Sequence, residues 1–145
     1  MMDERPVLDQ VNLVVKDMDA AVSFYRLLGL VIPDRDPLWD DHHRSADGPG
    51  GVDLDLDSET FAPKWDAGWP GSTGRSGLVM GLRVSTRDDV DRLYAAVTAA
   101  GYRSQQPPYD AFWGARYAIV EDPDGNAVGL MSPIDPELKS TPPAM

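Results

Sequence analysis

Alternating carboxylates are the residues whose types and spacing best suit chemistry in this sequence. From Gly51 to Ser58 (GVDLDLDS), every second residue is an aspartate, and apolar residues stand between them. Because successive side chains of a β-strand point to opposite faces, Asp53, Asp55 and Asp57 share one face. Like charges at this spacing can raise the pKa of one carboxyl group, as in acid–base pairs, or receive a cationic ligand group. At the outer edge of a sheet they would do neither, so both interpretations stay open.

The two histidines are the other candidates for acid–base chemistry. His42 and His43 are adjacent, so on a strand they point to opposite faces and cannot bind one metal ion without a bend. One of them could face the carboxylates as an acid, a base or a polar anchor, because imidazole titrates near neutral pH. The alternative is a polar pair on a sheet rim beside Asp40, Asp41 and Arg44. The candidate catalytic residues are His42, His43 and Asp53.

Other nucleophile and phosphate-binding patterns are missing from the sequence. It has no Gly-x-Ser-x-Gly motif, and we expect the two histidines to lack a spaced set of partners, which argues against a serine hydrolase. It has no Gly-x-Gly-x-x-Gly or phosphate-loop motif either. Cysteine is absent from the chain, which excludes disulfides, thiolate metal sites and cysteine nucleophiles.

Tryptophan is the third notable residue type. Trp39, Trp65, Trp69 and Trp113 lie where we expect loops or strand starts, outside the apolar stripes of the predicted helices. Flat aromatic side chains on loops can stack on a planar ligand and bury a large area. Alternatively, they fill the ends of the core or seal a contact in a dimer. Trp113 lies in an aromatic block with Arg116, which could orient an anion or simply pair with Asp110.

Charge and composition exclude several classes of function. The 13 basic and 24 acidic residues give a net charge of -11, and no basic stripe is present for nucleic acid. The acidity favours cationic ligands or is simply a solvated surface. No apolar run reaches the roughly 18 residues of a membrane span, and the charged N-terminus shows no secretory signal. Together with the lack of cysteine, this favours the cytoplasm.

A repeated pattern must position these residues. A predicted strand from Val7 to Val15 precedes a helix with an apolar i, i+3, i+4, i+7 stripe that ends at Gly29. Leu82 and Val84 repeat Leu13 and Val15 at an offset of 69 residues, and a similar helical stripe follows. The closing glycine comes three residues later in the second copy, at Gly101, so we expect the second helix to be almost one turn longer.

Short strands complete each repeat. In the first copy we predict strands at Leu30–Pro33, His42–Ala46 and Gly51–Ser58, and in the second at Tyr102–Gln105, Gly114–Val120 and Ala127–Met131. The last two are joined by Asp122–Asn126, whose Pro and Gly are typical of a hairpin turn. The predicted fold is α+β, with a β-α-β-β-β module at residues 7–58, an inter-module loop at 59–76, a second module at 77–133 and a mobile tail at 134–145.

This arrangement resembles the vicinal oxygen chelate superfamily, which includes glyoxalase I, extradiol dioxygenases, fosfomycin-modifying enzymes and bleomycin-resistance proteins. The resemblance spans about residues 7–133 and rests on the double module, its opening VNLVVKDMDAAVSFYRLLGL and its closing EDPDGNAVGLM. It implies curled mixed sheets around a concave cavity, and a homodimer.

The resemblance also implies four positions for metal ligands. They fall at Gln10, Asp53 (or Asp55 if the register differs by two), Val79 and Gly129. Valine and glycine cannot coordinate a cation, so we expect no cofactor at the family position; a divalent metal with an unusual ligand set is the alternative.

Taken together, the sequence predicts a glyoxalase/bleomycin-resistance type of protein that sequesters a planar or cationic small molecule without metal chemistry. The alternatives are a lyase, isomerase or dioxygenase of the same superfamily, and a regulatory module whose cavity is filled by its own tryptophans. The predicted ligand-binding residues are Gln10, Trp39, Asp53, Asp55, Trp65, Trp69, Phe112, Trp113 and Arg116.

Overall fold

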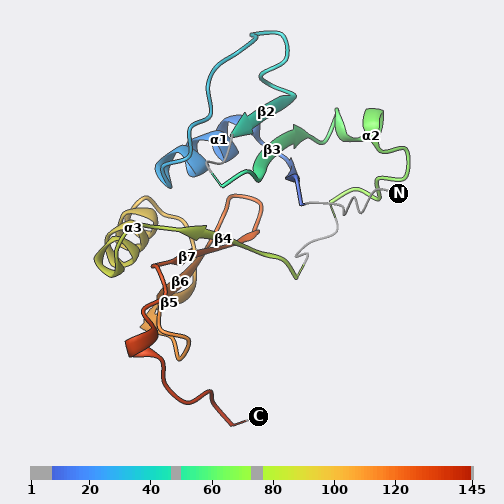
Figure 1. Ribbon diagram of the computed structural model, residues 1–145. Coiled ribbons are helices and arrows are strands. Elements are labelled where there is room, and N and C mark those ends of the chain that lie inside the picture. The colour runs from blue at the N-terminus through green and yellow to red at the C-terminus, as the bar shows by residue number, and fades with distance from the viewer. Residues whose placement is uncertain (1–7, 47–49, 73–76, 145) are drawn as a thin grey trace. The chain divides into compact units, whose positions relative to one another are not determined.

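The computed structural model describes residues 8–46, 50–72 and 77–144 of the chain (Figure 1). The chain divides into two compact units, residues 1–73 and 74–145. Each unit combines helices with one mixed sheet, which confirms the predicted α+β class. None of the helices in the described ranges has the length and apolar character needed to cross a membrane.

The first unit is a three-stranded sheet with one long helix. In chain order its elements are β1 (Gln10–Val15), α1 (Met18–Leu27), β2 (His43–Ala46), β3 (Asp53–Ser58) and the short α2 (Ala62–Trp65). The strand order is β1-β3-β2, with β1 parallel and β2 antiparallel to the central β3. The apolar sides of β1 and β3 are buried, and so are Phe24 and Tyr25 of α1.

The sequence explains where α1 begins and ends. The carboxylate of Asp17 accepts a hydrogen bond from the backbone N–H of Ala20 at 3.1 Å, which satisfies one of the free N–H groups of the first turn. Beyond the helix, Gly29 has a φ of +99°, a conformation that glycine adopts without strain.

The predicted strand at Leu30–Pro33 is wrong, because these residues form no strand in the structure. Two arginine side chains bind the carbonyl groups that a strand would use. The Nε of Arg26 donates to the carbonyl of Ile32 at 3.1 Å, and Arg44 donates to that of Pro33 at 3.2 Å. Pro33 also lacks the N–H group that a sheet ladder needs.

The second unit is a four-stranded sheet. Its elements are β4 (Val79–Arg83), α3 (Arg87–Ala99), β5 (Ser104–Asp110), β6 (Arg116–Glu121), β7 (Ala127–Met131) and the 3-10 helix η1 (Pro136–Leu138). The strand order is β4-β7-β6-β5, with only the β4–β7 pair parallel. Helix α3 has 13 residues against 10 in α1, as the later glycine predicts. The predicted hairpin is also confirmed: the carboxylate of Asp122 accepts from the N–H groups of Asp124 and Asn126, and Gly125 has a φ of +83°.

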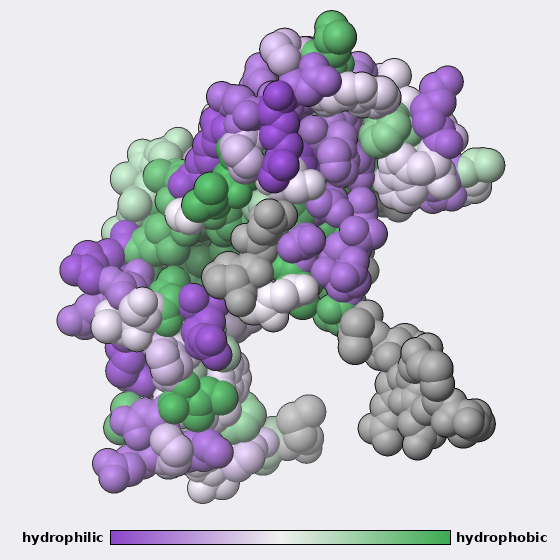
Figure 2. Space-filling model, turned by 45° about the horizontal axis from the view of Figure 1, so that its top comes forward, coloured by the Kyte–Doolittle hydropathy of each residue, from purple (hydrophilic) through white to green (hydrophobic). Residues whose placement is uncertain are grey.

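The two parallel strand pairs have the same register. Gln10 and Asn12 lie opposite Asp53 and Asp55 in the first unit, and the second unit pairs Val79 with Ala127 and Gly81 with Gly129. On the face of the molecule shown in Figure 2, hydrophilic residues cover much of the surface and hydrophobic residues gather in smaller patches. The segment after β7 is tied to its own unit, because Ser140 donates to the carbonyl of Phe112 at 2.9 Å.

Candidate functional site

One face of the first sheet carries the predicted carboxylates. Strand β3 is central, so its aspartates do not lie on an outer edge, and that interpretation of the sequence is wrong. Asp53 is half-buried, whereas Asp55 is only 8% exposed and Asp57 only 1%. Burial of two carboxylates on one strand is costly unless other groups compensate their charge.

Asp57 is hydrogen bonded from both neighbouring strands. Its Oδ2 accepts from the side-chain amide of Asn12 on β1 at 2.9 Å, and its Oδ1 lies 2.6 Å from Nδ1 of His43 on β2. The register explains this contact, because His43 lies directly opposite Asp57. A carboxylate can only accept, so Nδ1 of His43 must carry the proton in this contact.

Ser45 links the same histidine to the second buried carboxylate. Its hydroxyl donates to Oδ1 of Asp55 at 2.7 Å, and its Oγ lies 3.3 Å from Nε2 of His43. The prediction that the histidines lack spaced partners is therefore wrong for His43. The missed signal is the pattern His-x-Ser on β2, which an antiparallel register places opposite Asp-x-Asp on β3.

His42 does not join this network. Its Nδ1 lies 3.0 Å from Oγ of Ser58, at the end of β3, and its ring packs edge-on against Trp39. The two adjacent histidines thus have separate environments. Of the three candidate catalytic residues, the structure brings only His43 into contact with a buried carboxylate; Asp53 lies two residues from Asp55 on the same face.

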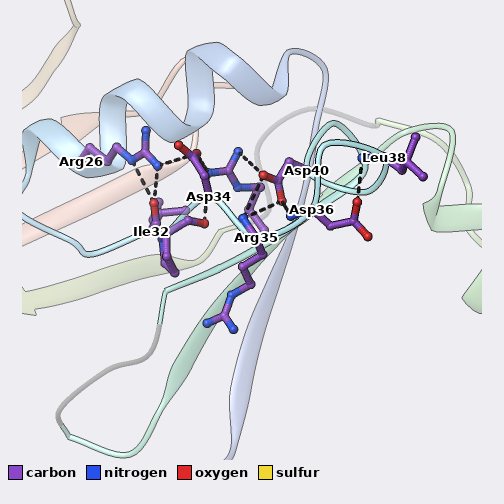
Figure 3. Close-up of polar contacts among 9 residues, drawn as sticks. Arg26, Ile32, Asp34, Arg35, Asp36, Leu38 and Asp40 are labelled. Carbon is purple, nitrogen blue, oxygen red and sulfur yellow. Dashed lines mark hydrogen bonds and ion pairs between the residues drawn. The ribbon is translucent and has the colours of Figure 1, made fainter.

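The loop before β2 is held in place by paired charges (Figure 3). Arg44, which is 7% exposed, donates to Asp34 at 2.7 Å, and Arg26 contacts the same carboxylate at 3.1 Å. These hydrogen bonds, that of Arg44 first, lower the pKa of Asp34 below its usual range. The carboxylate of Asp40 accepts from the N–H groups of Arg35 and Asp36 at 3.1 and 3.2 Å. The loop that carries Trp39 is therefore fixed by its own aspartates.

Trp39 and Phe61 form an aromatic rim near His43. Their ring centroids lie 5.4 Å apart, and that of Phe61 lies 6.2 Å from that of His43. Trp39 is 52% exposed. The other two tryptophans of this unit are placed differently: Trp65 is the exposed last residue of α2, and Trp69 is half-buried in the loop that follows.

The second unit carries a separate aromatic cluster, which contains Tyr109, Phe112, Trp113 and Tyr117. Neighbouring rings meet edge-on, with centroids 5.2 to 6.4 Å apart. Arg116 lies beside it and pairs with carboxylates: its Nε donates to Asp91 at 3.1 Å, and a terminal nitrogen donates to Asp110 at 3.3 Å. These partners, Asp91 above all, raise the pKa of Arg116. The pairing with Asp110 is one of the two roles that the sequence left open.

Tyr117 occupies the space beside Gly129. A Cβ atom added to Gly129 would lie 2.8 Å from the Tyr117 hydroxyl and 3.1 Å from its ring. Burial, and then the neighbouring Tyr109, raise the pKa of Tyr117 above its usual value. The sequence showed that position 129 is a glycine, but not that the Tyr117 side chain fills the space beside it. The hairpin register, which places Tyr117 opposite Met131, two residues from Gly129, was the available signal.

The positions that the resemblance assigns to a metal do not form a ligand set. Val79 offers no donor atom and is 42% exposed, and the side-chain space at Gly129 is filled by Tyr117. The register also makes Asp55, not Asp53, the counterpart of Gly129. Within the described residues, no group of three or more His, Cys, Asp or Glu side chains is arranged to hold a metal ion.

Comparison with curated proteins gives no match. Solved structures of similar fold cover most of the chain. They include a glyoxalase-related enzyme from Fulvimarina pelagi, with a TM-score of 0.74 and 19% identity, covering 88% of this chain and 88% of that one. A glyoxalase/bleomycin resistance protein/dioxygenase from Nocardioides has a TM-score of 0.67 and 26% identity, covering 92% and 87%. Lactoylglutathione lyase from Agrobacterium tumefaciens has a TM-score of 0.65 and 21% identity, covering 88% and 94%.

The family comparison covers the same part of the chain. The model of the Glyoxalase/Bleomycin resistance protein/Dioxygenase superfamily matches residues 7–130, which includes both long helices and both parallel strand pairs except the last residue of β7. The chain therefore belongs to the glyoxalase/bleomycin resistance protein/dioxygenase superfamily.

Proposed function

We propose that this protein binds a planar, cationic small molecule on the acidic face of β3, without a metal ion. The observation that carries the proposal is the burial of Asp55 and Asp57 side by side on one sheet face. Among the described residues, their hydrogen-bond donors are a serine, an amide and an imidazole, and none is Lys or Arg.

The carboxylates retain unused capacity for a ligand. An ionised carboxylate offers about four acceptor positions. The donors among the described residues fill two positions on Asp57 and one on Asp55. A ligand cation beside the half-buried Asp53 would lie on the same face and offset the repulsion between the two buried negative charges, so charge favours it.

The aromatic rim supports a flat ligand. Trp39 is half-exposed on a loop that charge pairs hold in place, and the ring of Phe61 contacts those of both Trp39 and His43. An aromatic face attracts a cation as well as an apolar ring, and more strongly when water is excluded. A ligand that is both planar and positively charged would therefore use the rim and the carboxylates together.

The test is a titration with proflavine, a planar cation, and with acridone, a neutral planar compound of similar shape. Proflavine should raise the melting temperature by several degrees and quench tryptophan fluorescence, since a ligand at about 100 times its Kd stabilises the folded state by about 2.7 kcal/mol. Acridone should do neither. Equal shifts with both compounds would contradict the role of charge.

Matched variants locate the site. D55N and D57N should each weaken proflavine binding about tenfold, because each removes one of the two buried charges. The control is D19N, which removes an exposed carboxylate from α1 and changes the net charge equally. If D19N weakens binding as much as D57N does, the effect comes from overall charge and the proposed site is wrong.

A further inference from the structure

Four side chains on the acidic face form one continuous series of polar contacts. Asp57 lies 2.6 Å from Nδ1 of His43, Nε2 of His43 lies 3.3 Å from Oγ of Ser45, and Ser45 donates to Asp55 at 2.7 Å. The series runs from one buried carboxylate to the other through a single imidazole and a single hydroxyl. Each of the three contacts needs one proton to become a hydrogen bond.

When the imidazole of His43 is neutral, this series of contacts lacks one proton. With both carboxylates ionised, two protons are available, one on the ring of His43 and one on the hydroxyl of Ser45. Asp57 requires the ring proton on Nδ1, and Asp55 takes the hydroxyl proton. The Nε2 lone pair of His43 is then left without a proton from Ser45, and it can accept one from elsewhere.

A proton that reaches Nε2 supplies the missing hydrogen bond. The imidazolium then donates to Asp57 through Nδ1 and to the Ser45 oxygen through Nε2, while Ser45 still donates to Asp55. All three contacts become hydrogen bonds in the same geometry. Asp57 thus fixes the ring so that Nε2, and not Nδ1, is the nitrogen that can take a proton, as a positioned general base requires.

We propose that His43 is a metal-free general base that removes a proton from a carbon acid, with Asp57 as its positioning residue. In this step the C–H bond of the substrate breaks, its proton passes to Nε2, and the electron pair stays on the substrate. The location of a natural substrate rests on the proposed function, which places it on this acidic face. The His43 side chain is 42% exposed, and Phe61 offers a ring beside it.

The tautomer of His43 tests the positioning directly. The chain has only two histidines, so nitrogen NMR of the imidazole rings gives two sets of signals, which H42Q assigns. Neutral His43 should carry its proton on Nδ1, because Asp57 can only accept there. D57N should shift the population toward the Nε2–H form. A neutral His43 that is mainly Nε2–H in the parent would overturn the proposal.

A probe reaction tests the base itself. In 5-nitrobenzisoxazole, removal of the ring C–H proton sends its electron pair into a nitrile and breaks the N–O bond, which releases a coloured phenolate. A positioned base contributes about 100-fold or more, so H43Q should lose at least about tenfold in kcat/KM. H42Q, whose imidazole contacts Ser58, should stay within about twofold. Equal rates for the parent and H43Q would overturn the assignment.

The two proposals fail separately. Proflavine binding depends on the carboxylates and should persist in H43Q, provided that the melting temperature shows this variant to be folded. If binding persists but neither the tautomer nor the probe rate follows the expectation, the base is wrong and the binding site stands. If the base behaves as expected and proflavine does not bind, the general base stands and the proposed binding site is wrong.

Discussion

The two parallel strand pairs, β1–β3 and β4–β7, share one register but carry opposite chemistry on the corresponding faces. Asn12 and Asp55 of the first pair correspond to Gly81 and Gly129 of the second. The first face holds buried carboxylates with an imidazole, whereas the space beside Gly129 is filled by Tyr117. One backbone pattern thus supports a polar site in one copy and a packed aromatic cluster in the other.

Substitutions on the apolar sides of the two strand pairs should cost similar stability, because these sides form the cores of the two units and not the proposed site. Leu56 and Leu130 occupy corresponding register positions and are almost fully buried. L56A and L130A should each lower the free energy of unfolding by about 2–5 kcal/mol, through lost burial and the cavity left behind. Urea unfolding of both variants measures this. A loss below about 1 kcal/mol in only one of them would show that the two cores are not equivalent.

The corresponding positions Gly129 and Asp55 should respond in opposite directions to substitution. G129E should destabilise the protein by about 1–3 kcal/mol, because even its Cβ atom would lie 2.8 Å from the Tyr117 hydroxyl. The control is the same change in a Y117A background, where the space is empty and the penalty should shrink. Equal penalties in both backgrounds would contradict the packing explanation; a double-mutant cycle by denaturant unfolding decides this.

D55N should instead stabilise the protein, on the order of 1 kcal/mol. It removes one of two like charges buried on one strand and keeps an oxygen that can accept from Ser45. Stability would rise while proflavine binding falls, as expected where a site is maintained at the expense of stability. D19N, at an exposed position of α1, should change stability by less than about 0.5 kcal/mol. A clear loss of stability in D55N would show that Asp55 is a structural residue.

The smallest expected effect concerns alkaline pH. Because the pKa of Tyr117 is raised in the folded state, the folded protein holds this proton more tightly than the unfolded chain does. Its contribution is complete below the unfolded pKa of about 10 and is lost as the pH rises through the folded value. Y117F should therefore flatten the fall in melting temperature between about pH 9 and pH 11. If the melting temperature of Y117F falls with pH as steeply as that of the parent, the raised pKa of Tyr117 is contradicted.

Local patterns in the sequence were sufficient for much of the fold. The apolar stripes predicted both helices, the later glycine predicted the longer α3, and the alternation in GVDLDLDS predicted the two faces of β3. These features depend on neighbours within one element. The strand at Leu30–Pro33 failed because Arg44, eleven residues beyond Pro33, binds its carbonyl group, and local propensity does not include such a contact.

The site was only partly predictable for the same reason. Sequence alone identified His43 and the aspartates as candidates, but not that His43, Ser45 and Asp57 touch. That contact depends on the register between β2 and β3, which local sequence patterns do not specify. Tyr117 over Gly129 is a similar case, because only the hairpin register brings these residues together.

The most direct test of the contrast between the two faces is a map of backbone amide chemical shifts during a proflavine titration. We expect the largest changes at Asn12, His43, Ser45 and Asp55, on the three strands of the first sheet, and little change from Ala127 to Met131. Changes centred on Tyr117 and Gly129, with the first sheet unaffected, would contradict the account.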